Sequence, residues 1–460
     1  MSIVAIVLAA GKGTRMQSAV PKVLHPICGV PIIQHVVNNL RGAGVRRIMV
    51  VVGPDGLDAD LGPDIEYVTQ QERLGTGHAV MQAEKALTGY KGSVLVLTGD
   101  APLYREETLR NFIDYHSAQR ALGTVLTVEV EDPTGYGRII RDANGHLEKV
   151  VEQRDAEPSE KLIKEINSGS FVFDSTALFK ALGHVTPDNL QKEYYLPDVL
   201  PILRNVPGGK VGVFKHDAPE EALGINDRIQ LAEAERILRD RLREKWLLAG
   251  VTLVDPANIY IDAAAEIAPD ATLMPFTFIE GNTVIGSGSV VGPFTRLQNV
   301  QVGENTSICQ STVVDSTLGP ECEIGPFSYI RPGSNLKAGV KVGPFSEIKN
   351  STIDEGSKVP HLSYIGDTDM GKRVNVGAGA ITCNFDGVEK FRTTIKDDVF
   401  IGSNSNLVAP IEIGAGAFIA AGSTVTGDVL PGALAVARNR QKNIADWAHK
   451  KVKKRRSEEE

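Results

Sequence analysis

The chain has 460 residues, of which 42% are hydrophobic and 23% are charged, and its formal net charge is −8. This composition is typical of a globular protein with about two to four domains and excludes a disordered chain. The negative charge does not indicate a nucleic-acid surface, and no stretch approaches the roughly 18 apolar residues that span a membrane. Residues 2–10 are apolar but lack the positive region of a secretory signal, so we expect a cytoplasmic protein. Four cysteines without a CxxC pair favour neither a disulfide scaffold nor a zinc site.

Residues 1–225 alternate between short apolar runs rich in β-branched residues and helix-like patterns. This alternation predicts a Rossmann-like α/β domain, in which helices cover both faces of a mainly parallel sheet. The charged amphipathic pattern of residues 226–248 contains no Pro or Gly and predicts a solvated helical linker over 226–250. The expected strands are Ile3–Ala10, Ile48–Val52, Val94–Leu97 and Val125–Val130, and the expected helices include Ile32–Leu40 and His78–Ala86.

From residue 251 onward, aliphatic residues recur at every sixth position. A period of six matches neither a helix face nor strand alternation, but it fits the flat sides of a triangular coil whose aliphatic residues point inward. Three sides per coil predict a hexapeptide parallel β-helix of about eight to ten coils over 251–460. Residues 377–394 interrupt the rhythm and predict a loop on one face, often a binding face. The recurring residues are Ile267, Leu273, Ile279, Ile285, Val291 and Leu297, then, after a slip of one, Val302 and Ile308, then Leu318, Ile324, Ile330, Leu336, Val342 and Ile348, and finally Ile395, Ile401, Leu407, Ile413, Ile419 and Val425.

A glycine-rich loop follows the first expected strand, where residues 8–16 read Leu-Ala-Ala-Gly-Lys-Gly-Thr-Arg-Met. Glycines allow backbone N–H groups to approach a polyphosphate, and Arg15 and Lys22 supply charge to neutralise it. The loop is not a P-loop, because a Gly-Lys-Ser/Thr sequence does not follow four residues after its first Gly. It is not a dinucleotide fingerprint either, because Met16 stands where the third Gly belongs. For this loop alone, an ordinary strand–turn–helix connection is an equally good interpretation.

Asp100 closes another expected strand, in the segment Thr98-Gly99-Asp100-Ala101-Pro102. Open α/β sheets bind ligands at the carboxyl ends of their strands, and a carboxylate there can hold Mg²⁺ against nucleotide phosphates. A helix N-cap is the simpler alternative for this Asp.

These two elements together resemble the sugar-1-phosphate nucleotidyltransferases. Joined to a hexapeptide solenoid, nearly the whole chain resembles the bifunctional N-acetylglucosamine-1-phosphate uridyltransferases/glucosamine-1-phosphate N-acetyltransferases. The resemblance implies a left-handed β-helix. It also implies two reactions: acetyl transfer from acetyl-CoA to glucosamine-1-phosphate, then uridylyl transfer from UTP, which yields UDP-N-acetylglucosamine for peptidoglycan and other envelope polymers. The further motifs that carry it are Gln70 with 74–79 (Leu-Gly-Thr-Gly-His-Ala), 135–139 (Gly-Tyr-Gly-Arg-Ile), Val151-Glu152, 166–169 (Ile-Asn-Ser-Gly) and 224–227 (Gly-Ile-Asn-Asp).

The resemblance assigns roles in the uridylyl-transfer half residue by residue. It implies that a sugar phosphate oxygen attacks the α-phosphorus of UTP and that pyrophosphate leaves, without a side-chain nucleophile. Mg²⁺, bound by Asp100 and Asn226, would act together with Arg15 and Lys22 by positioning and by neutralising charge. The implied nucleotide and sugar-nucleotide contacts are Leu8, Ala10, Gly11, Lys22, Gln70, Gly75, Thr76, Gly137, Glu152, Asn167 and Asn226, with Gly137, Glu152 and Asn167 on the N-acetylglucosamine moiety.

The same resemblance assigns the acetyl-transfer half. A His with a pKa near its ordinary value can take the proton of an amine, and a carboxylate can fix its tautomer. The resemblance makes His361 this general base, Glu347 its orienting partner, and Asn384 a residue that touches substrate and acetyl-CoA. The implied sugar-phosphate contacts are Arg331, Lys349, Tyr364 and Asn375, and the implied acetyl-CoA contacts are Ala378, Asn384, Phe385, Ser403, Ala421 and Arg438.

One residue departs from the family pattern: Phe385 stands where the family commonly has Tyr, so any hydrogen bond from that hydroxyl is absent. We expect the neighbouring Cys383 to be a small inward residue rather than a catalytic thiol. A flat-sided prism has no deep pocket, and the resemblance implies a homotrimer with clefts between neighbouring prisms. Six of the seven residues 450–456 are basic. A solvated tail is the simpler expectation for them, and contact with the phosphates of CoA is the alternative.

Two other functions stay open at this point. One is a single-activity nucleotidyltransferase whose solenoid only assembles or regulates it, an arrangement similar to ADP-glucose-forming enzymes. The other is a solenoid interaction protein with a degenerate first domain. The presence of the residues assigned above to each of the two reactions argues against both alternatives.

Overall fold

The computed structural model describes residues 2–451, and the chain divides into two compact units with the boundary between Leu242 and Arg243. Residues 452–456 of the expected basic tail lie outside the described residues. Among residues 2–451, no helix combines the length and the apolar character that a membrane crossing needs.

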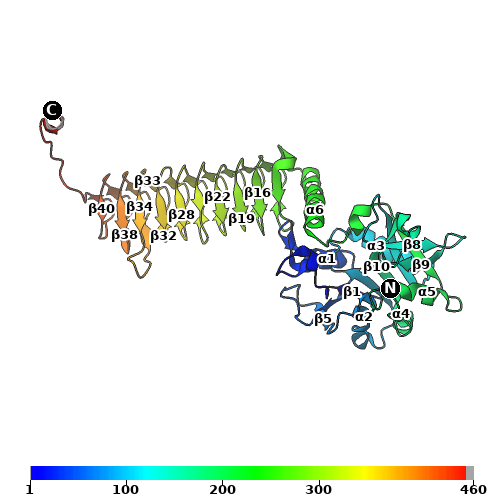
Figure 1. The fold of residues 1–460 in the computed structure, drawn as a ribbon. Coiled ribbons are helices and arrows are strands. Elements are labelled where there is room, and N and C mark those ends of the chain that lie inside the picture. The colour runs from blue at the N-terminus through cyan, green and yellow to red at the C-terminus, as the bar shows by residue number, and fades with distance from the viewer. Residues whose placement is uncertain (1, 452–460) are drawn as a thin grey trace, which may run out of the picture. The chain divides into compact units, whose positions relative to one another are not determined.

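The first unit contains a central sheet (Figure 1). Its strands follow the order β11-β7-β10-β6-β1-β4-β5. The pairs β1–β4, β1–β6, β4–β5 and β7–β11 are parallel, which confirms the expected mainly parallel α/β sheet. β10 runs antiparallel to β6, β7 and β8, an extension that the alternating pattern did not predict. The strands are β1 (Ile3–Leu8), β4 (Arg47–Val52), β5 (Ile65–Thr69), β6 (Ser93–Thr98), β7 (Gly123–Glu129), β8 (Gly137–Arg141), β9 (Leu147–Val151), β10 (Glu165–Asp174) and β11 (Val211–His216), with a small separate pair β2 (Pro26–Ile27) and β3 (Val30–Pro31).

Helices cover both faces of this sheet because neighbouring residues of its central strands point to opposite sides. Val4 and Ile6 of β1 belong to one buried cluster, whereas Ala5 and Val7 belong to another. The helix expected over His78–Ala86 is shorter, because after Met81 the chain tightens into the 3₁₀ turn η3 (Lys85–Leu87). The first cluster packs against α2 (Thr76–Met81), α4 (Ser175–Leu182) and α5 (Val199–Arg204), and the second packs against α1 (Ile32–Gly42) and α3 (Glu106–Gln119).

The charged segment near residue 230 forms one helix, α6 (Arg228–Leu248), as expected. It is more than a solvated spacer. In the first unit, Ala234 is buried beside Ile27, and the Glu235 carboxylate accepts a hydrogen bond of 2.8 Å from the backbone N–H of Cys28. In the second unit, Trp246 belongs to the hydrophobic core. The charge pattern did not predict these contacts, because only Ala234, Leu242 and Trp246 of α6 are buried.

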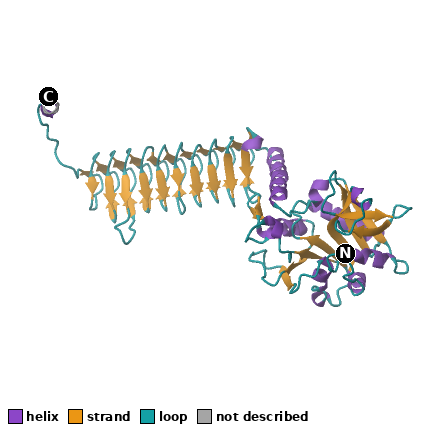
Figure 2. Cartoon of the chain, in the orientation of Figure 1, coloured by secondary structure: helices purple, strands orange, loops and turns teal. Residues whose placement is uncertain are grey.

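The second unit is the expected left-handed parallel β-helix, built from short strands that stack into three flat faces (Figure 2). Face 1 has eleven strands, face 2 has ten and face 3 has nine. Face 1 consists of β12 (Thr252–Leu253), β15 (Thr272–Leu273), β18 (Val290–Val291), β21 (Ser307–Ile308), β24 (Glu323–Ile324), β27 (Lys341–Val342), β30 (Lys358–Val359), β33 (Asn375–Val376), β36 (Phe400–Ile401), β39 (Phe418–Ile419) and β41 (Leu434–Ala435). Face 2 consists of β13 (Ile259–Ile261), β16 (Thr277–Glu280), β19 (Arg296–Gln298), β22 (Thr312–Val314), β25 (Tyr329–Ile330), β28 (Glu347–Lys349), β31 (Tyr364–Gly366), β34 (Ile381–Cys383), β37 (Asn406–Val408) and β40 (Thr424–Val425). Face 3 consists of β14 (Glu266–Ile267), β17 (Val284–Ile285), β20 (Gln301–Val302), β23 (Thr317–Leu318), β26 (Asn335–Leu336), β29 (Thr352–Ile353), β32 (Thr368–Met370), β35 (Thr393–Ile395) and β38 (Ile411–Ile413).

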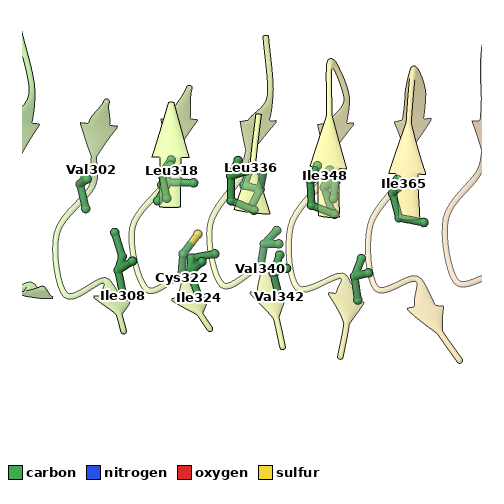
Figure 3. Packing of buried hydrophobic residues seen from close by; sticks show 14 of the residues in the cluster. Val302, Ile308, Leu318, Cys322, Ile324, Leu336, Val340, Val342, Ile348 and Ile365 are labelled. Atoms are coloured by element: carbon green, nitrogen blue, oxygen red, sulfur yellow. The ribbon is translucent and has the colours of Figure 1, made fainter. Parts of the chain in front are cut away.

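The residues of the six-residue period form one continuous apolar column inside the β-helix (Figure 3). Every member that the sequence predicted is buried. The column also runs through a stretch that the pattern missed, where Ile353, Val359, Ile365 and Val376 are buried. Met370 and the polar Thr382 occupy inward positions there, so the aliphatic rhythm is harder to see.

Two corners of the prism matter for function. The first corner joins face 1 to face 2 and contains His361; the second joins face 2 to face 3. The expected insertion leaves the second corner as a loop, residues 384–392, between β34 and β35 (Figure 1). Residues 377–383, which the sequence also placed outside the rhythm, lie in the regular coil.

Candidate active sites

A cavity of about 360 Å³ lies in the first unit where β1 and β6 end. The chain passes from β1 to β4 and β5 on one side and returns to place β6 on the other side of β1, so the strand order switches direction there. Leu8 is paired with Thr98, which brings the glycine-rich loop beside Asp100. The lining includes eight predicted site residues, namely Leu8, Ala10, Gly11, Lys22, Gln70, Gly75, Thr76 and Asp100.

The glycine-rich loop does not lead directly into an α-helix. It is followed by two 3₁₀ turns, η1 (Thr14–Met16) and η2 (Lys22–Leu24), and α1 begins only at Ile32. A phosphate at this loop would therefore meet loop N–H groups and basic side chains rather than a helix N-terminus. Gly13 has a φ of +61°, and a Cβ there would lie 2.6 Å from Cβ of Lys22, so only Gly lets Lys22 pack against the loop.

Lys22 connects the residues expected to bind metal. Its ammonium pairs with Oδ2 of Asp100 and lies 3.1 Å from Oδ1 of Asn226, which also accepts a hydrogen bond of 2.8 Å from Arg15. The Asp100 and Asn226 oxygens thus already converge on one cation. The described residues contain no group of three or more His, Cys, Asp or Glu side chains suited to a metal. Two protein oxygens nevertheless fit Mg²⁺, which keeps several waters and binds substrate phosphates.

The segment that the resemblance assigns to the base of the nucleotide, Gln70 with residues 74–79 (the base-reading segment), forms one wall of the cavity. Gln70 is 3% exposed, and its Nε2 donates to the carbonyl oxygen of Gly75 at 3.1 Å and lies 3.0 Å from Nδ1 of His78. Thr76 Oγ1 accepts a hydrogen bond from the backbone N–H of Leu196. Gly75 has a φ of +105°, and a Cβ there would lie 2.6 Å from the carbonyl oxygen of Tyr194.

Sequence reasoning assigned no role to three charged residues that line this cavity, Lys12, Arg73 and Glu193. Nε of Arg73 donates to the carbonyl oxygen of Ala10 at 2.6 Å and so ties the base-reading segment to the glycine-rich loop. The position of Arg73 between the predicted nucleotide contacts Gln70 and Gly75 could have indicated that it lines the same cavity. Glu193 carries no such signal, because only the fold brings it to the cavity.

The three residues expected to bind the sugar lie together. Asn167 of β10 is in register with Gly137 of β8, and a Cβ on Gly137 would lie 3.1 Å from Oε1 of Glu152. Burial, together with the nearby Asp155 and Asp198 carboxylates, raises the pKa of Glu152 to about 7. Burial and Asp155 also raise the pKa of Asp198 to about 6. A protonated Glu152 can donate a hydrogen bond, which an ionised carboxylate cannot do.

Face 2 of the β-helix collects most of the predicted sugar-phosphate residues. Glu347 and Lys349 lie on β28, and Tyr364 of β31 is in register with Glu347. Arg331 pairs with Glu347 at 2.7 Å. The ring of Tyr364 lies over Gly366, since a Cβ there would meet the phenolic oxygen at 2.4 Å. Asn375 lies apart from these residues, on face 1.

Four of the six predicted acetyl-CoA residues form a row along the first corner, whereas Asn384 and Phe385 lie at the second corner. Backbone hydrogen bonds connect successive coils at the first corner, from Gly379 to His361, from Asn404 to Ala378 and from Gly422 to Ser403. A Cβ on Gly402 would lie 2.5 Å from the backbone nitrogen of Ala421, and one on Gly422 would lie 3.9 Å from Cδ of Arg438. His361, Ala378, Ser403, Ala421 and Arg438 therefore follow one another up this corner.

No side-chain hydrogen bond or ion pair joins His361 to Glu347 among the described residues. Coil length is the reason: Glu347 is in register with Tyr364, seventeen positions later, whereas His361 follows Glu347 by only fourteen. The Glu347 carboxylate instead pairs with Arg331. His361 is exposed at the corner, and its carbonyl oxygen accepts a hydrogen bond from Ser363.

Asn384 lies at the opposite edge of face 2, where the inserted loop begins. It is 7% exposed, its side-chain Nδ2 donates to Oδ2 of Asp367, and its backbone carbonyl oxygen accepts from the backbone N–H of Phe391. Phe385 next to it is 58% exposed, which leaves its ring available for contact. In the same loop, the neighbouring ammonium of Lys349 lowers the pKa of Lys390, a residue that sequence reasoning missed.

Together, the fold and these sites define a nucleotidyltransferase unit joined to a hexapeptide-repeat transferase unit. A family model described as nucleotidyl transferase matches residues 4–204, and one described as bacterial transferase hexapeptide (six repeats) matches residues 392–427.

Full-length relatives narrow this class. The chain is 51% identical over 98% of both chains to "Bifunctional protein GlmU" of Heliobacterium modesticaldum. It is 49% identical to the protein of the same name in Halalkalibacterium halodurans, over 97% of this chain and 98% of that one, and 48% identical to that of a Geobacillus species, over 96% and 97%. The chain belongs to the bifunctional GlmU family. It is a bifunctional transferase that combines uridylyl transfer with acetyl transfer in the synthesis of UDP-N-acetylglucosamine.

The conformation of Gly75 leads to a prediction. We expect Gly75→Ala to raise the KM for UTP at least about tenfold, because the new methyl group displaces the Tyr194 backbone from the cavity wall. Gly89→Ala is the matched control, since Gly89 also has a positive φ but has nothing within 4 Å of the added Cβ. Steady-state kinetics of uridylyl transfer check this. Equal KM values for the two variants would contradict it.

The raised pKa of Glu152 leads to a pH-dependent prediction. The folded protein holds this proton up to about pH 7, whereas the unfolded chain releases it near 4.5, so stability from this group is lost as pH rises between these values. We therefore expect Glu152→Gln to raise the Tm of the protein at pH 8 and to leave it unchanged at pH 4.5. Glu148→Gln, at an exposed carboxylate of β9, is the control. A Tm difference that did not vary with pH would refute the assignment.

Proposed function

We propose that uridylyl transfer takes place in the cavity of the first unit and acetyl transfer at face 2 and the first corner of the second unit. The observation that supports the first assignment most strongly is the convergence of Lys22, Arg15, Asp100 and Asn226 beside the glycine-rich loop. No nucleophilic Ser or Cys lines this cavity, which fits a reaction whose nucleophile is supplied by the substrate.

In this proposal, N-acetylglucosamine-1-phosphate lies near Gly137, Glu152 and Asn167, and the base of UTP lies against Gln70, Gly75 and Thr76. A phosphate oxygen of the sugar attacks the α-phosphorus, the bond to the bridging oxygen breaks, and pyrophosphate leaves. Lys22, Arg15 and Arg73 neutralise the triphosphate and the charge that develops on it. Asp100 and Asn226 would hold Mg²⁺, which supplies further charge neutralisation when bound.

In the second unit, acetyl-CoA extends along the row from Ala378 to Arg438, with its thioester near His361. His361 takes a proton from the amine of glucosamine-1-phosphate, the nitrogen attacks the acetyl carbonyl, and the CoA thiolate leaves and takes up a proton. Arg331, Lys349 and Tyr364 bind the sugar phosphate. The pairing of Arg331 with Glu347 gives Glu347 a role in holding Arg331; we retain its expected contact with His361 only as a prediction.

A homotrimer completes this second site. His361 and Asn384 lie at opposite edges of face 2, so one chain does not surround a substrate with both. The first corner also exposes stacked apolar rings. The Phe276–Phe294 and Phe327–Phe345 pairs have centroid distances of 5.0 and 5.4 Å, and Phe345 is 62% exposed. A second copy would bury this stripe and bring its own residues toward face 2.

Two variants tested in parallel separate the reactions. We expect Asp100→Ala to lose uridylyl transfer by about 100-fold or more, with acetyl transfer unchanged, and His361→Ala to show the reverse. Pyrophosphate release and CoA release are the two readouts. Asp114→Ala, at an exposed position of α3, is the control for Asp100. Wild-type uridylyl transfer by Asp100→Ala would remove Asp100 from the mechanism.

The trimer has its own test. Sedimentation equilibrium of the full chain should give about three times the 49.4 kDa chain mass. Phe345→Asp should lower that mass to one chain and abolish acetyl transfer while uridylyl transfer continues, because a charge cannot be buried in an apolar contact. Val206→Asp, at an exposed apolar residue of the first unit, is the control. A wild-type chain that sediments as a monomer yet transfers acetyl groups would exclude the trimer.

A further inference from the structure

Asp367 is a buried carboxylate at the second corner to which none of the roles above has been assigned. It directly follows β31 and is 5% exposed, with a φ of +48°. Its backbone carbonyl accepts a hydrogen bond of 3.1 Å from Thr393, the residue where the inserted loop re-enters the β-helix. Its side chain accepts from Nδ2 of Asn384, where the loop begins. Asp367 therefore connects both ends of the loop 384–392.

The carboxylate also fixes which way two amide side chains face. It accepts from Nδ2 of Asn350 at 2.5 Å as well as from Asn384. An ionised carboxylate can only accept, so both amides must present their NH₂ groups to it. The side-chain amide oxygen of Asn384, Oδ1, consequently lies on the side away from Asp367, where it can accept a hydrogen bond.

Electrostatics keep Asp367 ionised despite its burial. Burial alone would raise its pKa, but the hydrogen bonds from Asn350 and Asn384 and the nearby Lys349 lower it. Nζ of Lys349 lies 3.8 Å from Oδ2 of Asp367. The same carboxylate thus contacts a predicted sugar-phosphate residue and a residue predicted to touch both substrates.

A purely structural role is the competing explanation. Asp315 occupies the same corner of a lower coil, also has a positive φ of +42°, and accepts a hydrogen bond of 2.9 Å from Asn299 one coil below. Asp315 is exposed, however, and lies at a corner without an inserted loop. The two residues occupy equivalent turns in different coils, but only Asp367 also accepts a hydrogen bond from Asn384.

We propose that Asp367 is a positioning residue for acetyl transfer, which holds the Asn384 amide with its carbonyl oxygen toward the amine of the amino sugar. A neutral amine donates through N–H, so an acceptor oxygen beside it would orient the nitrogen lone pair toward the acetyl carbon. This inference rests on the proposed acetyl-transfer function and adds a residue to it.

The test compares Asp367→Asn, Asp315→Asn and the exchange Asp367→Asn with Asn384→Asp in the full-length protein. In Asp367→Asn, one amide must turn, and we expect kcat for acetyl transfer to fall about 10- to 100-fold while the KM for acetyl-CoA stays within about twofold. Uridylyl transfer should not change in any variant. Asp315→Asn should retain wild-type kcat, because it alters only the shared turn.

The exchange restores both hydrogen bonds: position 367 still accepts from Asn350, and only the bond between positions 367 and 384 reverses its direction. It leaves a free carboxylate oxygen at position 384, so it should recover at least about fivefold of the lost kcat. Wild-type kcat in Asp367→Asn, or no recovery in the exchange, would overturn the proposal; a merely structural Asp367 would lower Tm without this pattern. If Asp367→Asn does not fold, the double variant with the exchanged residues is tested instead. Absence of acetyl transfer in that double variant overturns the proposal.

Two further variants separate this inference from the proposed function on which it rests. Asn384→Ala and His361→Ala should both lose acetyl transfer. If both retain it, the acetyl-transfer site itself is misplaced. If both lose it while Asp367→Asn does not, only the role of Asp367 fails.

Discussion

The inward position repeated along the β-helix is the constraint on which the second unit depends. Each coil contributes apolar side chains such as Leu336 and Ile348 to one shielded column, and parallel register then fixes every outward residue relative to the coils beside it. Outward residues carry the chemistry. Glu347 and Tyr364 face the same side of the prism because their strands are adjacent, and a one-residue slip would turn them inward.

In the first unit, the functional residues are placed by the order of the strands in the central sheet. The adjacency of β1 and β6 places the glycine-rich loop beside Asp100, and the start of α6 adds Asn226 to them. The glycine-rich loop and Asp100 each follow a strand whose side chains are mostly buried, and Asn226 lies two residues before α6. The cavity is therefore formed by loops, but its geometry comes from the sheet.

The sequence predicted most of this arrangement where a pattern is long or a motif is local. The six-residue period identified a buried position correctly each time, and the two short motifs at Gly11 and Asp100 meet in one cavity. The features that the sequence did not predict are those formed by residues far apart along the chain. The antiparallel β10 and the cavity residue Glu193 are placed by tertiary packing, which no local pattern reports. Coils of about seventeen residues place Tyr364, not His361, opposite Glu347, so the expected contact between His361 and Glu347 stays a prediction. The network around Asp367 was hidden because the inserted loop obscures the period at that point.

The central claim is that one polypeptide performs two successive group transfers at separate sites. The most direct measurement supplies the purified full-length protein with acetyl-labelled acetyl-CoA, glucosamine-1-phosphate, UTP and Mg²⁺, and follows the label by chromatography. The account predicts label in UDP-N-acetylglucosamine when all are present, and accumulation in N-acetylglucosamine-1-phosphate when UTP is omitted. Label that remained in acetyl-CoA under both conditions, with the protein active on UTP and supplied N-acetylglucosamine-1-phosphate, would contradict it.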